Sequence, residues 1–343
     1  MRILVTGATG LLGGSLTRRL VSQKKSLRVF VRPGTPADRL ERQGLDVCRG
    51  DLNDGERTRC ALQGVDTVFH CAARVSPSGP WEMFYESNVR GTEMIFRECV
   101  RAGVSKVIYL SSLGVYGPPQ DGEAIIESTP HDPSPATRGN YSHSKILAEK
   151  FVLGFAEASG LPVAIFRPGI IYGPDKKPPS SLLCIERGGL CLVVGSRNCL
   201  FPLTYVENLV DALLLAAEHL NRGIEQYNLV DDPDLTQEQF LKCKSSIVPL
   251  RAVFFPGWPL LAVAPIMERA VRILRVGGRL STFSRHPLQR ALQSVRYATD
   301  HIQRDLGWKP PIGLREALKK TLVTTPTKID VLQPVGAETD VAV

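Results

Sequence analysis

Short apolar runs alternate with longer amphipathic stretches from residue 1 to about residue 170. The runs that predict buried strands are Arg2–Thr6, Leu27–Arg32, Asp46–Arg49, Thr67–His70, Lys106–Ser111 and Val163–Phe166. The stretches with helical spacing are Leu11–Ser22, Asn53–Leu62, Trp81–Ala102 and Ser144–Ser159. Strands that alternate with helices indicate βαβ units and parallel pairing. Because the runs are almost continuously apolar, helices should cover both faces, so the predicted fold class is α/β with a doubly wound parallel sheet.

The texture of the chain changes near residue 174, where a Lys-Lys-Pro-Pro run opens a region of mixed short elements. We therefore expect residues 1–173 to form most of a dinucleotide-binding domain, with its sheet completed by later strands. Residues 174–323 are predicted to form mainly a smaller, interleaved substrate-binding lobe toward the C-terminus. Residues 324–343 are polar without periodicity and are predicted to be a flexible tail.

The first candidate site is a glycine-rich turn between the first predicted strand and helix. Gly7 permits a tight turn, Gly10 lets backbone N–H groups approach a pyrophosphate, and Gly13 lets the helix pack close to the sheet. The helix N-terminus then favours an anion through its unpaired N–H groups and its dipole. We expect the turn to bind a dinucleotide through Gly7, Thr9, Gly10, Leu11, Leu12 and Gly13.

Residues that follow the next strands extend this prediction. Arg32 stands where NAD-selective sites place an acidic residue on the ribose 2′-hydroxyl, and a guanidinium there suits a 2′-phosphate. The cofactor expected from Arg32 is therefore NADP(H) in preference to NAD(H). Further cofactor contacts are expected from Asp51 and Leu52 beside the adenine, and from Cys71, Ala72 and Ala73 on the far side of the cofactor.

The second candidate site is the spacing Tyr141-Ser142-His143-Ser144-Lys145. Residues four apart share one face of a helix, so the phenol and the ammonium can reach one bound molecule. A free phenol has a pKa near ~10 and is a poor base at neutral pH, whereas a nearby cation favours its ionised form. We therefore expect Lys145 to lower the pKa of Tyr141. Ser112, at the end of a predicted strand, is placed to hold the substrate oxygen beside Tyr141.

Composition narrows the possible partners and locations. The 343 residues carry 42 Lys and Arg against 34 Asp and Glu, a net charge of +8, and contain no nucleic-acid-binding motif, so no nucleic acid partner is expected. The 8 cysteines form no C-x-x-C pair and have no accompanying His cluster, which favours reduced thiols, no metal site and a cytoplasmic location. No apolar run reaches the about 20 residues of a membrane helix, and the strand-like opening argues against secretion.

The combined motifs resemble those of the extended short-chain dehydrogenases/reductases, a family with a Rossmann fold. The family's T-G-x-x-G-x-x-G matches Thr6–Gly13, and its catalytic Ser, Tyr and Lys match Ser112, Tyr141 and Lys145. The resemblance also implies that Asn88 is catalytic, because the family's Asn holds a proton-relay water through its backbone. It implies a homodimer, and nicotinamide contacts from Pro168, Gly169, Ile170 and Ile171.

Two branches of that family compete for the substrate. Nucleotide-sugar epimerases usually carry an Arg that contacts the sugar-nucleotide diphosphate where this chain has Phe201 and Pro202. Three other segments resemble the 3β-hydroxysteroid dehydrogenase branch: Gly79–Glu82, Tyr205–Asn208 and Leu306–Pro310. The preferred hypothesis is therefore an NADP(H)-dependent oxidoreductase that interconverts a secondary alcohol and a ketone on a bulky lipophilic, sterol-like molecule.

Three alternatives stay open at this point. A nucleotide-sugar epimerase or reductase is the second enzyme hypothesis, and a regulatory protein that binds NADP without chemistry is a third. The third is disfavoured because such proteins usually lose the Tyr or the Lys. Residues 247–296 combine an apolar stretch with seven arginines between Arg269 and Arg296, so contact with a membrane surface is also considered.

Overall fold

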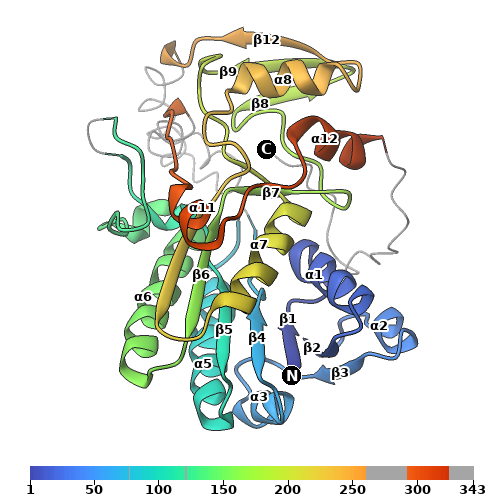
Figure 1. Cartoon of the computed structure of the whole chain (residues 1–343). Helices are drawn as coiled ribbons and strands as arrows, with labels where there is room; N and C mark the ends of the chain where they lie inside the picture. The colour runs from blue at the N-terminus through green and yellow to red at the C-terminus, as the bar shows by residue number, and fades with distance from the viewer. Residues whose placement is uncertain (77, 120–121, 260–291, 324–343) are drawn as a thin grey trace.

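The computed structural model describes residues 1–76, 78–119, 122–259 and 292–323, and its centre is a seven-stranded sheet (Figure 1). The strand order is β11-β6-β5-β4-β1-β2-β3, and every neighbouring pair is parallel. This confirms the predicted Rossmann-type α/β fold. The strands are β1 Arg2–Thr6, β2 Ser26–Val31, β3 Asp46–Arg49, β4 Thr67–His70, β5 Lys106–Leu110, β6 Val163–Pro168 and β11 Ile224–Leu229.

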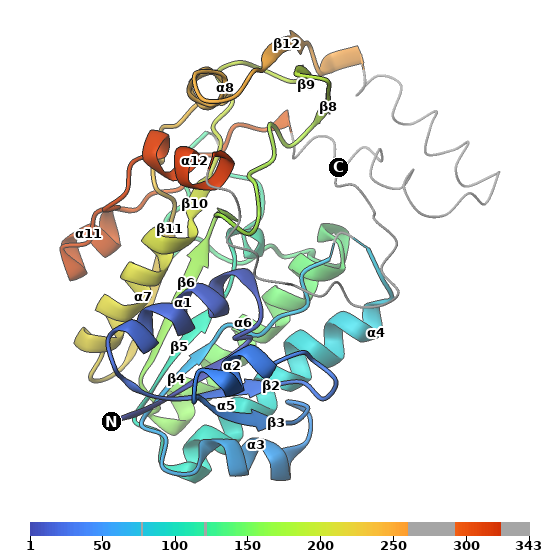
Figure 2. The same cartoon turned by 90° about the vertical axis from the view of Figure 1, so that its right-hand side faces the viewer.

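Helices cover both faces of this sheet because successive strand residues point to opposite sides. In β1, Ile3 and Val5 pack with α1 and α7, whereas Leu4 packs with α3, α5 and α6. The two helical layers are visible when the sheet is turned (Figure 2). The helices of the described residues around the sheet are α1 Leu11–Ser22, α2 Asp38–Arg42, α3 Gly55–Leu62, α4 Trp81–Phe84, α5 Gly91–Ala102, α6 Asn140–Ser159 and α7 Val206–His219.

A smaller lobe lies at the carboxyl end of the strands (Figure 1). Its three-stranded sheet has the order β12-β9-β8, and α8 begins with a capping box between Thr236 and Gln239. A short parallel pair, β7 with β10, connects the lobe to the main sheet. The elements are β7 Ile170–Tyr172, β8 Cys184–Arg187, β9 Leu190–Val194, β10 Leu203–Tyr205, α8 Gln237–Ser245, β12 Arg251–Phe255, α11 Asp300–Leu306 and α12 Leu314–Leu322.

Three predicted boundaries were wrong in ways that matter for the site. The helix expected over Trp81–Ala102 is interrupted by a π-helical turn, Tyr85–Arg90, which widens the helix locally. Helix α6 begins at Asn140 rather than Ser144, after Gly139 takes a φ of 78°. Strand β6 continues through Pro168, where a loop was expected after Arg167, because β11 pairs with it up to that residue.

Smaller shifts affect the other predicted elements. Strands β2 and β5 each end one residue earlier than expected, and β2 also begins one residue earlier, at Ser26. Helix α3 begins at Gly55 instead of Asn53, because the Asp54 carboxylate caps the N–H groups of Glu56 and Arg57. The expected tail, 324–343, and most of the segment 247–296 lie outside the described residues. Among the described helices, none combines the length and apolarity needed to span a bilayer.

A buried ion pair joins α6 to β6 beneath the carboxyl edge of the sheet. The Arg167 guanidinium donates from Nε to Oε1 of Glu149 at 2.9 Å and from Nη2 at 2.6 Å. Both side chains are almost inaccessible, at 2% and 0% exposure. Glu149 also accepts hydrogen bonds from His131 Nε2 at 2.7 Å and from Ser111 Oγ. These bonds offset the cost of burying the charges, so the pair is sensitive to the loss of either partner.

We predict that Arg167→Met lowers the free energy of unfolding by about 3–5 kcal/mol, because it leaves the Glu149 carboxylate buried without its main counter-charge. Urea denaturation at neutral pH measures this change. The matched control is Arg90→Met, which removes an exposed pair with Glu86 and should change stability by less than about 1 kcal/mol. Equal effects of the two substitutions would contradict the role given to the buried pair.

Candidate active site

The glycine-rich turn closes tightly over the ends of β1 and β4. Gly7 has a φ of 72°, and a Cβ on it would lie 2.8 Å from the backbone nitrogen of Ala72. A Cβ on Gly13 would run into the carbonyl oxygen of Gly7. The N–H of Gly10 donates to that same oxygen at 3.0 Å. These contacts show why the turn requires glycine at the first and third positions of the motif.

The N-terminus of α1 is open to an anion. Gly10 is the N-cap, and no side chain caps the first turn of the helix. Thr9 and Gly10 are exposed and Leu11 is half-buried, whereas Leu12 belongs to the core. The first backbone N–H groups of α1 can therefore donate to a pyrophosphate, and the residues present fit a dinucleotide.

The other residues expected on the adenine side lie along the same edge of the sheet. The register pairs Thr6 of β1 with Phe30 of β2, so Arg32 emerges beside the glycine-rich turn, and it is exposed. Asp51 is exposed and its Oδ1 accepts from the Asn53 N–H at 2.9 Å. Leu52 is half-buried against α5, where a Cβ on Gly91 would lie 3.2 Å from its own Cβ.

The residues after β4 line the turn from the other side. Thr6 pairs with His70 in the sheet register, so Cys71, Ala72 and Ala73 follow directly beside the turn. All three are half-buried. Burial raises the pKa of the Cys71 thiol to about 12, so this cysteine is protonated and unreactive at neutral pH.

The segment expected beside the nicotinamide is braced by β10 and β11. The Gly169 N–H donates to Thr204 Oγ1 at 3.1 Å and to the Leu229 carbonyl at 3.0 Å. A Cβ on Gly169 would collide with the carbonyl oxygen of Pro202. Pro168 is buried, and Ile170 and Ile171 are half-buried. A strand pair, and not the free loop expected from the sequence, therefore carries these four residues.

Tyr141 and Ser112 meet at the carboxyl edge of the sheet. Tyr141 lies in the first turn of α6, and Ser112 is the second residue after β5. The Ser112 hydroxyl lies close enough to the phenol to lower the pKa of Tyr141 against the effect of burial, and Ser112 Oγ accepts from the Gly114 N–H at 3.1 Å. A Cβ on Gly114 would lie 2.8 Å from Ser142 Oγ, so glycine permits α6 to approach this turn. The structure thus brings together the predicted phenol and serine hydroxyl.

Lys145 lies one turn further along α6, on the face of Tyr141. Its side chain is buried, and its Nζ donates to the Leu110 carbonyl at 2.6 Å and lies 5.0 Å from the Tyr109 ring centroid. Burial lowers the pKa of Lys145 to about 8, against the opposing charges of Glu149 and Cys71. The ammonium is thus held by the end of β5 beneath the active-site edge.

In the chain without cofactor, Lys145 is not among the groups that lower the pKa of Tyr141, and the expectation that Lys145 lowers it beside a bound nicotinamide stays a prediction. Burial raises the pKa of Tyr141 to about 12, and the hydrogen bond from Ser112 is what lowers it in part. The physical reason is that the phenol lies in a poorly solvated site, which disfavours its charged form. The Lys145 ammonium instead donates to a backbone carbonyl.

Asn88 lies in the π-helical turn and is completely buried. Its Oδ1 accepts from the Arg74 N–H at 2.6 Å, and its Nδ2 donates to the Arg74 carbonyl at 3.1 Å and to Ser144 Oγ at 2.8 Å. Its own carbonyl accepts from Thr92 Oγ1 at 2.7 Å. The side chain therefore braces the site, a role that the sequence did not indicate; that its backbone holds a relay water stays a prediction.

A buried hydrogen-bond chain through His70 links the dinucleotide turn to the Asn88 turn. Thr6 Oγ1 lies 2.8 Å from His70 Nδ1, and His70 Nε2 lies 3.0 Å from Thr92 Oγ1. The Thr92 hydroxyl donates its proton to the Asn88 carbonyl. Nε2 of His70 must therefore donate to Thr92 Oγ1, and Nδ1 of His70 must accept from Thr6. Burial lowers the pKa of His70 to about 3, which keeps this ring neutral. Thr6, His70 and Thr92 all lie in or next to the sequence motifs, but only the folded structure shows that they are hydrogen bonded to one another.

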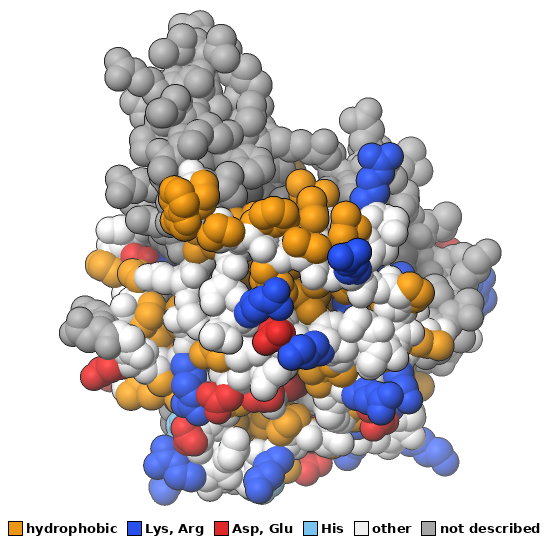
Figure 3. Space-filling model, turned by 90° about the horizontal axis from the view of Figure 1, so that it is seen from above, with side chains coloured by type: hydrophobic (Ala, Val, Ile, Leu, Met, Phe, Trp, Pro, Cys, Tyr) orange, Lys and Arg blue, Asp and Glu red, His pale blue; other side chains and the backbone are white. Residues whose placement is uncertain are grey.

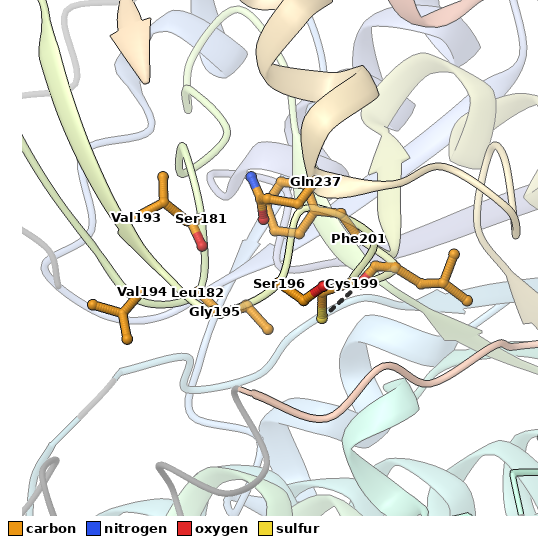
Figure 4. A pocket seen from close by; sticks show the side chains of 10 residues that line it. Ser181, Leu182, Val193, Val194, Gly195, Ser196, Cys199, Phe201 and Gln237 are labelled. Carbon is orange, nitrogen blue, oxygen red and sulfur yellow. Dashed lines mark hydrogen bonds between the residues drawn. The ribbon is translucent and has the colours of Figure 1, made fainter. Parts of the chain in front are cut away.

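A pocket of the lobe lies apart from these residues (Figure 4). Gln237 of α8 and Phe201 lie together on one side of it, and Val193 of β9 lies on the other side. Phe201 is buried and packs against Phe240, with ring centroids 5.0 Å apart. Where a diphosphate-binding arginine was considered, the chain therefore has a core aromatic residue.

Comparison with known proteins gives the family. The sequence model of the "NAD dependent epimerase/dehydratase family" matches residues 3–229, which include the glycine-rich turn, Ser112, Tyr141 and Lys145. The chain belongs to this family. The resemblance to the extended short-chain dehydrogenases/reductases is thereby confirmed, and so is the assignment as an enzyme that acts on CH–OH groups with a nicotinamide dinucleotide.

Relatives with different substrates are equally similar to this family member. The chain is 28% identical to a 2-alkyl-3-oxoalkanoate reductase of Stenotrophomonas maltophilia, with 93% of this chain and 98% of the relative covered. It is 28% identical to a 3-beta-hydroxysteroid dehydrogenase of Mycolicibacterium neoaurum, over 99% and 96%. It is also 28% identical to a UDP-glucose 4-epimerase of Vibrio cholerae, over 93% and 94%. The overall sequence identity therefore does not indicate which of these substrate classes this protein uses.

The fold comparison agrees with the family. The crystal structure of gox2253 superposes with a TM-score of 0.79 at 27% identity and covers 94% of this chain and 97% of its own. The similarity thus includes the lobe as well as the sheet. The substrate must be argued from the residues at the active-site edge and in the lobe.

A buried carboxylate holds the strand pair next to the nicotinamide segment. Asp231 follows β11; its Oδ2 accepts from the Tyr205 N–H at 2.7 Å, and its own N–H donates to the Leu203 carbonyl at 2.9 Å. Burial raises the pKa of Asp231 to about 7, and the Tyr205 N–H opposes the shift. The folded protein therefore holds a proton here at pH values at which the unfolded chain has lost it.

We predict that the stability of the wild type falls relative to Asp231→Asn as the pH rises from about 4 to about 7. In this window the folded state binds more protons than the unfolded state, so each pH unit costs up to about 1.4 kcal/mol. Urea denaturation of both proteins between pH 4 and pH 8 measures the difference, which should level off above about pH 7. If the stabilities of the two proteins change in parallel with pH across this range, the pKa of Asp231 is not raised in the folded state.

Proposed function

We propose that this protein is an NADP(H)-dependent oxidoreductase that interconverts a secondary alcohol and a ketone on a bulky lipophilic substrate. The observation that carries the proposal is the placement of the Tyr141 and Ser112 hydroxyls at the carboxyl edge of the sheet, close enough for Ser112 to lower the pKa of Tyr141, with Lys145 one helical turn away. Ligands of open α/β sheets bind at this edge. The glycine-rich turn follows β1 and opens on the same edge. In the sheet, β1 is the third strand after β6.

In this proposal Tyr141 is the general acid that supplies the proton to the substrate oxygen. A nicotinamide dinucleotide supplies hydride donor and acceptor chemistry when bound. In the reducing direction, Tyr141 gives its phenolic proton to the oxygen that gains negative charge, and Ser112 donates a hydrogen bond to that oxygen. The raised pKa of Tyr141 keeps the phenol protonated and ready to donate. In the oxidising direction the same phenol must lose its proton first, which burial opposes.

Lys145 and the His70 chain position this acid. The Lys145 ammonium, held by the Leu110 carbonyl, is placed to bind ribose hydroxyls and adds positive charge near the phenol. The neutral His70 ring couples the Thr6 turn to the carbonyl of Asn88. The two halves of the site are therefore held in one register before any ligand binds, which lowers the entropy cost of orientation.

Preference for the phosphorylated cofactor is proposed from Arg32. This exposed guanidinium follows β2 beside the glycine-rich turn, and its side chain has no hydrogen-bond acceptor among the described residues. A guanidinium binds phosphate oxygens through two parallel N–H donors. Asp51, the nearest acidic residue after β3, bonds to its own turn.

The lipophilic substrate is proposed from the lobe. Apolar side chains gather on the upper face of the molecule (Figure 3). In the lobe at the top of Figure 1, the exposed fractions of Phe255 in β12 and of Trp258 after it are 48% and 71%, and Ile185 of β8 and Leu190 of β9 are also exposed. Such exposure favours a water-insoluble substrate, and we extend it to peripheral contact of this face with a membrane surface for an otherwise cytoplasmic protein.

A homodimer is proposed through the outer surface of α5 and α6. Arg97 lies over the rings of Phe151 and Phe155 at 5.5 and 5.9 Å, and these rings stack 5.2 Å apart. Val100 on the same helix as Arg97 is 40% exposed. Aromatic and arginine side chains are enriched at subunit interfaces.

A nucleotide-sugar epimerase is the second candidate, supported by the family and by the Vibrio cholerae relative. The buried Phe201 weighs against it, because a diphosphate needs a cation where this ring packs in the core. The two candidates share Tyr141 and differ in substrate. A panel of sterols, aliphatic ketones and UDP-sugars with NADPH and NADH distinguishes them by absorbance.

We predict that Tyr141→Phe lowers kcat on any ketone that the panel identifies by about 10²–10⁴-fold, the range for loss of a general acid. Cofactor binding, measured by thermal shift with NADPH, should persist because the phenyl ring is kept. Tyr85→Phe, on the π-helical turn, is the matched control and should retain turnover. Wild-type turnover of Tyr141→Phe would refute the proposed acid.

We predict that Arg32→Ser reduces the ratio of kcat/KM with NADPH to that with NADH by roughly tenfold to a hundredfold. The substitution removes a charge-assisted contact to the 2′-phosphate and leaves the rest of the turn intact. Steady-state kinetics of wild type and variant with both cofactors give the ratio. A wild type that prefers NADH would overturn the reading of Arg32.

A further inference from the structure

Arg74 lies between the dinucleotide turn and the catalytic helix. It follows Ala72 and Ala73 after β4, and the Ala72 N–H donates to Thr6 Oγ1 at 3.2 Å. Two residues before Arg74, the chain therefore touches the glycine-rich turn. The segment that carries Arg74 therefore starts at the edge of the sheet where the glycine-rich turn lies.

The backbone of Arg74 is held in register with Tyr141. Asn88 bonds to both the N–H and the carbonyl of Arg74, and its amide donates to Ser144 Oγ. Ser144 Oγ in turn donates to the Tyr141 carbonyl at 2.7 Å. A completely buried amide thus connects the Arg74 backbone to the first turn of α6, and its position is fixed without any ligand.

The guanidinium lies on the loop that docks against the start of α6. Its Cζ lies 5.7 Å from the ring centroid of buried Phe84, and its Nη2 is 3.9 Å from where a Cβ on Gly79 would be. The Gly79 carbonyl accepts from Asn140 Nδ2 at 2.9 Å, and Asn140 immediately precedes Tyr141. The same loop residue therefore contacts both the guanidinium and the start of the catalytic helix.

The charge of Arg74 has no partner within the described residues. Its Nε is buried without a hydrogen bond, and no described carboxylate pairs with it. Many arginines elsewhere in the described part of the chain do have such a partner: Arg2, Arg18, Arg19, Arg28, Arg49, Arg59, Arg90, Arg101, Arg138, Arg167, Arg197 and Arg296. A half-buried guanidinium on an aromatic ring, with donors to spare, is suited to a planar anion.

From this geometry we infer that Arg74 binds a carboxylate of the substrate, close to the carbon whose oxygen Tyr141 protonates. The substrate class is then an acid with an apolar body and a 3-hydroxy or 3-oxo group, so that anion and reacting carbon are a few bonds apart. The inference rests on the proposed function, because it assigns a specificity residue to the same reaction. The carboxylate takes no part in bond making; Arg74 orients it.

The test compares one stable substrate with its neutral counterpart. The probes are a 2-alkyl-3-hydroxyalkanoic acid and its methyl ester, each with NADP⁺. Oxidation passes the hydride of C3 to NADP⁺ and the hydroxyl proton to the Tyr141 phenolate, which has first released its own proton to solvent. We expect wild type to favour the acid, and Arg74→Met to lower the acid-to-ester ratio of kcat/KM about tenfold to a hundredfold. Arg74→Lys should recover part of the ratio, and Arg90→Met, the control, should keep it.

A binding measurement separates orientation from turnover. In the Tyr141→Phe background, calorimetry with the acid and NADP⁺ should show tighter binding than in the doubly substituted Tyr141→Phe, Arg74→Met protein, again about tenfold or more. Equal losses for acid and ester, or no acid preference in wild type that oxidises the ester, would overturn the Arg74 assignment while the proposed function stands. A protein that turns over only UDP-sugars would overturn both.

Discussion

The side-chain amide of Asn88 is the contact on which the site depends. It joins the loop after β4 to Ser144 of α6, while the carbonyl of the same residue closes the chain from Thr6 through His70 and Thr92. Every donor in this series of hydrogen bonds has an acceptor, so burying these groups costs little free energy. The loss of one member would leave a buried polar group without a partner. The π-helical turn aims the amide inward, which explains why a wider turn interrupts an otherwise regular helix.

Burial also determines the protonation states at the active-site edge. The phenol of Tyr141 stays protonated because its surroundings disfavour the anion, and the ring of His70 stays neutral for the same reason. Lys145 is a buried cation one helical turn from Tyr141, and Glu149, one turn further along α6, is balanced by Arg167. The positive charge of Lys145 and the positive potential at the start of α1 therefore face the same edge, an arrangement suited to a doubly phosphorylated, ribose-containing cofactor.

Substrate choice rests on residues outside the shared core. Relatives with acid, steroid and sugar-nucleotide names are equally similar to this chain, so the common fold and the common Tyr and Lys do not separate them. Three features of this chain bear on the choice: Phe201 is packed into the core of the lobe, Phe255 is exposed, and Arg74 has a buried Nε without a hydrogen-bond partner among the described residues. Specificity of this kind comes from a few polar groups on an apolar wall.

The sequence by itself determined the alternation of strands and helices, the glycine-rich turn and the Tyr141–Lys145 spacing, because each depends on local periodicity or on residues a few positions apart. Only the tertiary structure decided the hydrogen bonds and the burial that depend on contacts between different helices and strands. The spacing suggested that Lys145 acidifies Tyr141, yet burial sets the pKa of that phenol and a β5 carbonyl takes the ammonium. The π-helical turn, the extension of β6 by β11 and the link from Thr6 to His70 likewise arise from contacts between distant segments. Desolvation and long-range hydrogen bonds leave no periodic pattern in a sequence, so they become visible only once the chain is folded.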